Sequence, residues 1–145
     1  MWQNESSPNM TWEAVIILVL AVTAVLVVRR LALVSTKKAC RYLEEGALVV
    51  DVRNPEEFSQ GHVPGAINIP LSGLPESLDA CVSDKTQVLL LHCLGGGRSA
   101  VAKRLLRSNG YARAYNLGSY RRAERIASAS RPKTEPSLSH LPPSQ

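Results

Sequence analysis

A cysteine followed by three glycines, an arginine and a serine is the part of this sequence best suited to chemistry. The stretch reads Cys-Leu-Gly-Gly-Gly-Arg-Ser and covers residues 93–99. Three glycines allow successive backbone N–H groups to curl around the sulfur, because glycine adopts backbone angles that other residues resist. Negative charge at Cys93 is also favoured by Arg98, by the unpaired N–H groups of a helix start and by the helix dipole. These surroundings predict a thiol of lowered pKa that acts as a nucleophile.

The segments on either side of this loop predict how the cysteine is positioned. Residues 87–91 form a nearly unbroken apolar run, which is typical of a strand buried on both faces of a parallel sheet. A helix is expected over residues 99–109, with Gly110 as its stop signal. Ligands of parallel sheets bind beyond the carboxyl ends of the strands, which is where Cys93 falls. The same loop would hold an oxyanion of sulfur, phosphorus or arsenic. A buried structural thiol is the alternative, but it would need neither the glycines nor the arginine.

The rest of the pattern alternates strands with helices, which predicts an α/β domain with a small parallel sheet flanked by helices. Ser35 or Thr36 is expected to cap the first helix of this domain, and Asn54 is expected to cap a short helical turn. The expected elements, in chain order, are helix 35–46, strand 47–52, helical turn 54–57, strand 66–69, helix 75–82, strand 87–92, helix 99–109, strand 114–117 and helix 120–128.

Apolar residues are concentrated in a run that begins at Ala14, ends at Val28 and contains no charged residue. Its fifteen residues form about 22 Å of helix, against a hydrocarbon core of about 30 Å. Trp12 at one interface and the basic residues that follow Val28 at the other can extend such a span. The sequence therefore predicts a single transmembrane helix, with the membrane as a partner. The positive-inside rule places the N-terminus outside and the domain that follows in the cytoplasm.

Composition excludes several other classes of site. The chain has 17 basic and 12 acidic residues, but the charges are dispersed and aromatic residues make up only 5%, so no nucleic-acid partner is expected. Cys40, Cys81 and Cys93 are too few and too scattered for a disulfide framework, and no cysteine or histidine spacing indicates a metal site. Cys40 and Cys81 lie in helical patterns and are interpreted as packing residues.

Four regions follow from these patterns. Residues 1–13 form a polar N-terminal segment, and residues 14–34 form the expected membrane anchor with its basic flank. Residues 35–127 form the α/β domain. Residues 128–145 contain four prolines and five serines, a composition that cannot bury a core, so a disordered tail is expected.

Four segments, in this order, resemble the signatures of the rhodanese (sulfurtransferase) domain family. They are residues 50–58 (Val-Asp-Val-Arg-Asn-Pro-Glu-Glu-Phe), residues 61–70 (Gly-His-Val-Pro-Gly-Ala-Ile-Asn-Ile-Pro), the cysteine loop and residues 110–118. The resemblance covers residues 35–127. It implies a rhodanese-like fold, here a single unit that follows an N-terminal membrane anchor.

The resemblance also implies a reaction. The Cys93 thiolate attacks the outer sulfur of thiosulfate or another persulfide donor, sulfite leaves, and a thiol, cyanide or protein acceptor takes the sulfur from the Cys93 persulfide. Backbone amides of the loop would stabilise the persulfide and the departing anion, and no metal or organic cofactor is needed. The loop residues expected to bind substrate are Leu94, Gly95, Gly96, Gly97, Arg98 and Ser99.

Three further residues match family positions and are interpreted as support rather than chemistry. Asp51, at a strand end, is expected to bond loop amides, Arg53 is expected to take part in an ion pair, and His62 lies in a turn. Leu94 stands where a basic or polar residue is frequent in the family, which leaves room for a protein-bound or apolar persulfide donor.

Two other functions remain open. One is an arsenate reductase or phosphatase on the same scaffold, but Arg98 follows Cys93 after four intervening residues, and the cysteine phosphatase loop has one residue more. The other is a membrane-tethered binding module without enzymatic activity.

Overall fold

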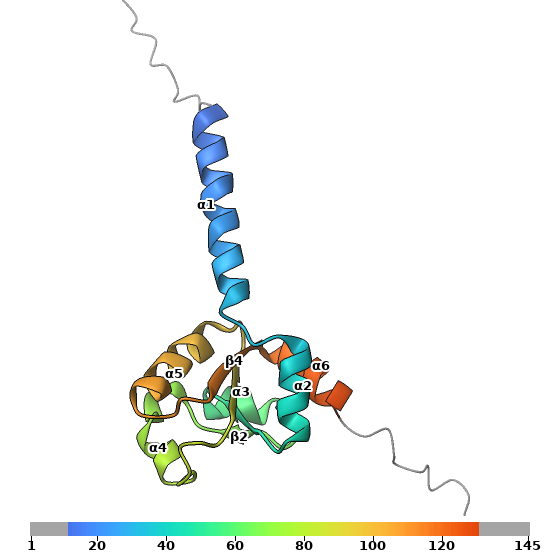
Figure 1. Cartoon of the computed structure of the whole chain (residues 1–145), viewed down its shortest axis with the longest axis vertical. Helices are drawn as coiled ribbons and strands as arrows, with labels where there is room; N and C mark the ends of the chain where they lie inside the picture. The colour runs from blue at the N-terminus through green and yellow to red at the C-terminus, as the bar shows by residue number, and fades with distance from the viewer. Residues whose placement is uncertain (1–11, 131–145) are drawn as a thin grey trace, which may run out of the picture. The chain divides into compact units, whose positions relative to one another are not determined.

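The computed structural model describes residues 12–130. The chain divides into two compact units, and the boundary lies between Leu33 and Val34 (Figure 1). The expectations for a polar segment at the extreme N-terminus and for a disordered tail concern residues that lie almost entirely outside the described range.

Helix α1 (Trp12–Leu31) accounts for nearly all of the described part of the first unit. Its large apolar side chains from Trp12 to Val28 are exposed. The uncharged run thus forms the helix that its composition predicts, with the apolar side chains on all sides rather than packed into a core.

The membrane assignment of this run is wrong. No helix within the described residues 12–130 is long and apolar enough to cross a membrane. The physical reason lies in the length of the uncharged segment, since fifteen residues between Glu13 and Arg29 rise only about 22 Å. This finding contradicts the single-pass localisation with its outside-to-cytoplasm orientation, and it gives no support to the membrane as a partner.

The second unit is built on a parallel sheet of four strands in the order β2-β1-β3-β4. The strands are β1 (Leu48–Asp51), β2 (Ile67–Asn68), β3 (Leu89–Cys93) and β4 (Ala114–Ser119). β3 pairs with a neighbour on each side, and all five of its residues are buried. Burial on both faces explains why this strand reads as an apolar run rather than as an alternating pattern.

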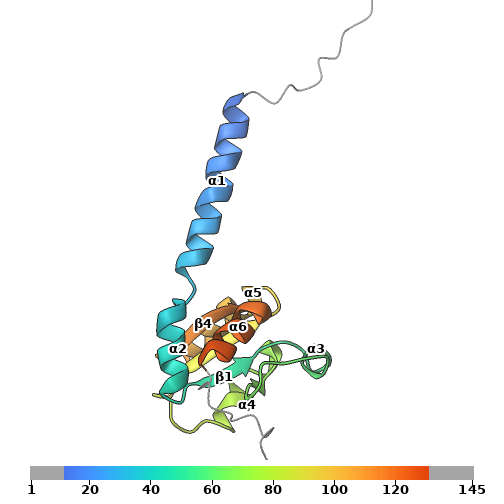
Figure 2. The ribbon, with the colours of Figure 1, turned by 90° about the vertical axis from the view of Figure 1, so that its right-hand side faces the viewer.

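Helices cover both faces of the sheet. Helices α2 (Thr36–Glu44) and α6 (Tyr120–Ser130) pack on one face with Val49, Leu90 and Leu117. The short 3₁₀ helix η1 (Leu71–Gly73), α4 (Glu76–Asp79) and α5 (Gly97–Ser108) pack on the other. Figure 1 shows α4 and α5 on the left of the strands and α2 and α6 on the right. α3 (Pro55–Ser59) lies in the connection between β1 and β2 (Figure 2).

The α/β architecture with a parallel sheet is therefore confirmed. Ser35 caps α2, where its Oγ accepts a hydrogen bond from the Lys38 amide at 3.4 Å. The helix expected over residues 75–82 is limited to Glu76–Asp79. α5 begins at Gly97 rather than at Ser99, because Gly96 precedes it in the left-handed conformation with φ of 90° and leads directly into the helix.

The core predicts a large loss of stability when β3 is truncated. Leu91 is fully buried in the core cluster that also contains residues of α4 and α5, so Leu91→Ala is expected to lower the free energy of unfolding by about 2–5 kcal/mol. Val101→Ala on α5 serves as the control, because this side chain is 52% exposed and its change is expected to stay within about 0.5 kcal/mol. Urea unfolding followed by circular dichroism measures both, and equal effects would contradict this assignment of the core.

Candidate functional site

Cys93 ends β3, and its sulfur lies within the curve of the loop that leads into α5. The Gly96 amide donates a hydrogen bond to Cys93 Sγ at 3.1 Å, and Ser99 Oγ lies 3.7 Å from the same atom. Cys93 is only 2% exposed. The strand end, the glycine loop and the first turn of α5 therefore surround one sulfur atom with hydrogen-bond donors, as the sequence predicts.

The surroundings of Cys93 act on its pKa in opposite directions. Burial raises the pKa of the thiol, since desolvation disfavours the thiolate. Hydrogen bonds from the Ser99 amide, the Ser99 hydroxyl and the amides of Gly96 and Gly95 lower it. The donors prevail, and the pKa of Cys93 lies below its ordinary value. The arrangement can therefore generate a thiolate that is largely shielded from water.

Arg98 is held by a carboxylate that the sequence analysis did not single out. Its Nη1 and Nη2 donate to Glu57 Oε2 and Oε1 at 2.6 and 2.8 Å, and this bidentate pair joins α5 to α3. The Arg98 guanidinium lowers the pKa of Glu57 to about 2. Glu57 also accepts from the Asn54 amide at 3.1 Å and so closes the first turn of α3. The pair fixes Arg98 at the start of α5 and neutralises much of its charge.

A second residue that the sequence analysis missed is Asn116, which is buried in β4. Its Oδ1 accepts from Ser99 Oγ at 2.8 Å and from the Gly118 amide at 2.9 Å. Its Nδ2 donates to the Gly96 carbonyl at 3.3 Å. A polar residue inside an otherwise apolar strand was the available signal, because a buried amide requires partners.

The loop glycines differ in the space around them. A Cβ at Gly95 or Gly97 would meet nothing within 4 Å, whereas a Cβ at Gly96 would meet the Gly118 backbone at 3.4 Å. Leu94 is 62% exposed beside this loop. The substrate-binding residues proposed from the sequence thus surround Cys93, with Leu94 facing solvent and Ser99 buried beneath the loop.

Asp51 and Arg53 form a buried ion pair, with Arg53 Nη2 at 2.6 Å from Asp51 Oδ2. Arg53 also donates to the Gly61 carbonyl at 2.7 Å and lies 4.7 Å from the centre of the Tyr120 ring. Asp51 is the register partner of His92, which precedes Cys93 and therefore points to the opposite face of the sheet. The contacts of this pair are with the scaffold rather than with the sulfur.

His62 is exposed, and its ring stacks on Phe58 at 4.1 Å between centres. Its Nδ1 lies 3.2 Å from the Phe58 carbonyl. These contacts lie within the turn after α3 and do not bring the imidazole to Cys93. The other two thiols are free, and Cys40 is partly buried whereas Cys81 is exposed.

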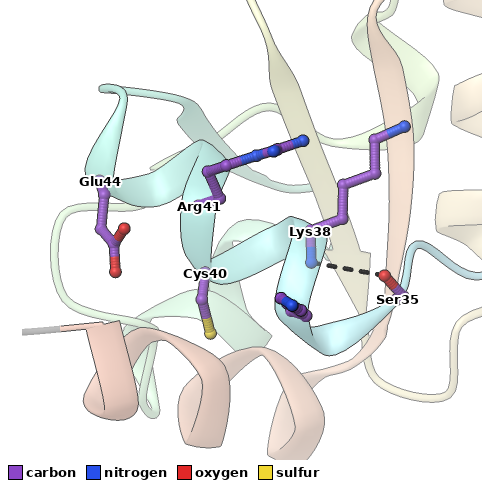
Figure 3. A pocket seen from close by; sticks show the side chains of 6 residues that line it. Ser35, Lys38, Cys40, Arg41 and Glu44 are labelled. Atoms are coloured by element: carbon purple, nitrogen blue, oxygen red, sulfur yellow. Dashed lines mark hydrogen bonds between the residues drawn. The ribbon is translucent and has the colours of Figure 1, made fainter.

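A groove of about 460 Å³ runs along α2 and is separate from the cysteine loop (Figure 3). In Figure 3, the Cys40 sulfur points in a different direction from the side chains of Lys38 and Arg41. The lining residues are Ser35, Lys37, Lys38, Cys40, Arg41 and Glu44. Within residues 12–130, no group of three histidine, cysteine or acidic side chains could hold a metal ion.

Residues 35–122 match the family described as the rhodanese-like domain. The chain is 42% identical over 69 residues to the thiosulfate sulfurtransferase PspE of Escherichia coli, an alignment that covers 48% of this chain and 66% of the relative. It is 36% identical over 73 residues to a sulfurtransferase of Allochromatium vinosum, covering 50% of this chain and 66% of that protein. The chain thus spans somewhat less than two thirds of the length of these curated relatives.

Solved structures show the same fold. A rhodanese with anions from E. coli is 38% identical, with a TM-score of 0.52, and the match covers 53% of this chain and 91% of that one. A human single-domain sulfurtransferase is 35% identical, with a TM-score of 0.53, and the match covers 63% and 93% of the two chains.

The surroundings of His92 predict an acid-sensitive fold. Both ring nitrogens are buried without a hydrogen-bond partner, and burial lowers the pKa of His92 to about 4. An unfolded histidine takes up a proton below a pH of about 6.5. The unfolded state therefore binds more protons between these values, and stability falls as the pH drops through this window.

His92→Leu is expected to remove a contribution on the order of 1–3 kcal/mol from the stability difference between pH 7 and pH 4.5. Urea unfolding at half-unit pH steps measures this difference. His62→Leu, which removes an exposed histidine, is the matched control. If His92→Leu keeps the pH dependence of the wild type, as His62→Leu is expected to do, the acid sensitivity does not come from His92.

Proposed function

The chain belongs to the rhodanese-like domain family, and on that basis we propose that it transfers sulfane sulfur through a persulfide on Cys93. The donor is thiosulfate or another persulfide, and the acceptor is a thiol, cyanide or a protein. The observation that carries the proposal is the 3.1 Å hydrogen bond from the Gly96 amide to Cys93 Sγ at a strand end that opens into a helix.

In the first half of the reaction, the Cys93 thiolate attacks the outer sulfur of thiosulfate. A bond forms between the two sulfur atoms, the sulfur–sulfur bond of thiosulfate breaks, and sulfite leaves with the electron pair. The loop amides and the Ser99 hydroxyl hold the negative charge of the thiolate before attack and of the persulfide after it. Because the thiolate forms before attack, this step requires no general base, metal or organic cofactor.

In the second half, an acceptor thiolate attacks the terminal sulfur of the Cys93 persulfide. The bond between that sulfur and Cys93 Sγ breaks, and its electron pair restores the Cys93 thiolate. The same amides that stabilise the resting thiolate stabilise this leaving group, so one set of donors serves both halves of the cycle.

Arg98 has a positioning role in this proposal. Its bidentate pair with Glu57 fixes the start of α5 relative to α3. The pKa of Arg98 is raised, mainly by Glu57 and to a smaller extent by Cys93. The positive charge of Arg98 and negative charge at Cys93 therefore stabilise each other. Arg98 therefore supports negative charge at the sulfur while it remains tied to the scaffold.

Intact mass spectrometry tests the proposal on the full chain. Incubation with thiosulfate is expected to add one sulfur atom, about 32 Da, to the protein, and a thiol is expected to remove it again. The reaction depends on how much of Cys93 is thiolate and on how well reagents reach it. Cys93→Ser is expected to add nothing, whereas a variant with both Cys40→Ser and Cys81→Ser gains the same mass as the wild type. If neither thiosulfate nor glutathione persulfide adds mass, oxyanion chemistry or a non-enzymatic binding module becomes the better explanation.

Leu94 is proposed to favour a donor that carries an apolar group. It follows the nucleophile directly and is 62% exposed, while the nearby Arg98 is paired with Glu57. A substrate at this opening meets an apolar side chain, whose contact favours an organic substituent by about 1 kcal/mol or more. Thiosulfate, a dianion without such a group, gains nothing from it.

Leu94→Arg is expected to reverse this preference. The ratio of kcat/KM for benzenethiosulfonate to kcat/KM for thiosulfate should fall by about tenfold, because one apolar contact is lost and the added cation attracts the dianion more strongly. Ala112→Arg adds the same charge at an exposed position in the connection before β4 and should leave the ratio unchanged. An unchanged ratio in Leu94→Arg would contradict this specificity.

A further inference from the structure

Asn116 lies at an irregular point of β4. Leu91 of β3 is the partner of Asn116, but the next residue, His92, is the partner of Gly118, so Leu117 is an extra residue in the pairing. Gly118 has a φ of 102°, and its amide donates to Asn116 Oδ1 at 2.9 Å. The Asn116 side chain therefore stabilises the bulge in its own strand.

The orientation of the Asn116 amide is determined by its partners. A backbone N–H can only donate, so the atom that faces the Gly118 amide must be the oxygen. The oxygen then accepts from both Gly118 and Ser99, which uses its two lone pairs. The Nδ2 atom is left to donate to the Gly96 carbonyl at 3.3 Å.

Two of these partners are the groups that contact the sulfur. Gly96 donates its amide to Cys93 Sγ, and Ser99 Oγ lies 3.7 Å from that atom. Gly96 adopts a φ of 90°, and its Cα is close enough to β4 that a Cβ would meet Gly118 at 3.4 Å. The loop is thus held against the bulge of β4 at the residue whose amide binds the sulfur.

We propose that Asn116 is a positioning residue for Cys93, which holds the loop so that the backbone amides of Gly96 and Ser99 donate to the sulfur. This inference rests on the proposed role of Cys93 as the nucleophile. Asn116 carries no charge and acts through the placement of two donors. The charged group that acts on the sulfur is Arg98 on α5, and Arg98 forms an ion pair with Glu57 on α3. The side chains that pack with Cys93 in the core cluster are apolar.

The ionisation of Cys93 provides a readout that a purely structural role would not change. In a full-chain background with Cys40→Ser and Cys81→Ser, the rate of alkylation by iodoacetamide as a function of pH reports the pKa of the remaining thiol. Asn116→Ala is expected to raise this pKa by about one unit, because the Gly96 amide is no longer held on the sulfur. Ser99 Oγ loses Asn116 Oδ1 as its acceptor in this variant, and its nearest remaining acceptor is the Gly96 carbonyl at 3.1 Å rather than Cys93 Sγ at 3.7 Å.

Asn68→Ala is the matched control. Asn68 also bridges two backbone segments, since its Nδ2 donates to the carbonyls of Asp51 and Arg53 at 3.0 and 2.9 Å. It makes no hydrogen bond with the cysteine loop, and both of its acceptors belong to the segment of β1. Its loss is expected to lower the melting temperature and to leave the pKa of the Cys93 thiol within about 0.2 units of the parent, because its contacts stabilise the fold alone.

Asn116→Asp covers the case in which Asn116→Ala does not fold. The carboxylate can still accept from Ser99 and Gly118, but it cannot donate to Gly96 and it adds negative charge near the sulfur. The thiol pKa is expected to rise more than in Asn116→Ala. The proposal is overturned if a folded Asn116 variant keeps the parental thiol pKa, or if Asn68→Ala shifts it equally. Alkylation requires no sulfur donor, so it reports the pKa of Cys93 whether or not the protein transfers sulfur. Failure of sulfur transfer would be detected in the separate mass-spectrometry experiment with thiosulfate.

Discussion

The structure depends on a balance at one sulfur atom. Burying Cys93 keeps water away from the sulfur but also penalises its charged form, so a thiolate is stable there only if fixed donors replace the lost solvent. The amides of Gly95, Gly96 and Ser99 and one hydroxyl supply that replacement. Because neutral donors act over short distances, the geometry of the loop matters more here than the net charge of the protein.

The rest of the domain keeps this geometry from two sides. On one side, Glu57 in α3 binds Arg98 at the start of α5. On the other side, Asn116 in β4 binds the loop carbonyl and the serine beneath it. β3 lies between its two neighbouring strands and fixes the Cα of Cys93. A loop rich in glycine would otherwise sample many conformations, and these attachments reduce that freedom without placing a side chain over the sulfur.

The sequence predicts local features of this domain well and distant pairings poorly. The apolar run of β3, the glycine loop and the helix stop at Gly110 are local signals, and each is confirmed by the structure. Glu57 and Asn116 were missed because their partners lie 41 and 17 residues away, and no spacing rule connects them. The exposed run of α1 shows the converse, since composition predicts the helix correctly but led to a membrane assignment that the length of the run does not support.

The three loop glycines have unequal freedom to change during evolution. Gly96 is constrained by its left-handed backbone and by the approach of Gly118, so any side chain there introduces strain. Gly95 and Gly97 face open space, and side chains could be added at both without moving their neighbours. Single substitutions at Gly95 and Gly97 can therefore change the surface of the loop, while the Gly96 amide that binds the sulfur is preserved. The loop thus separates the residue that contacts the sulfur from the residues that are free to diversify.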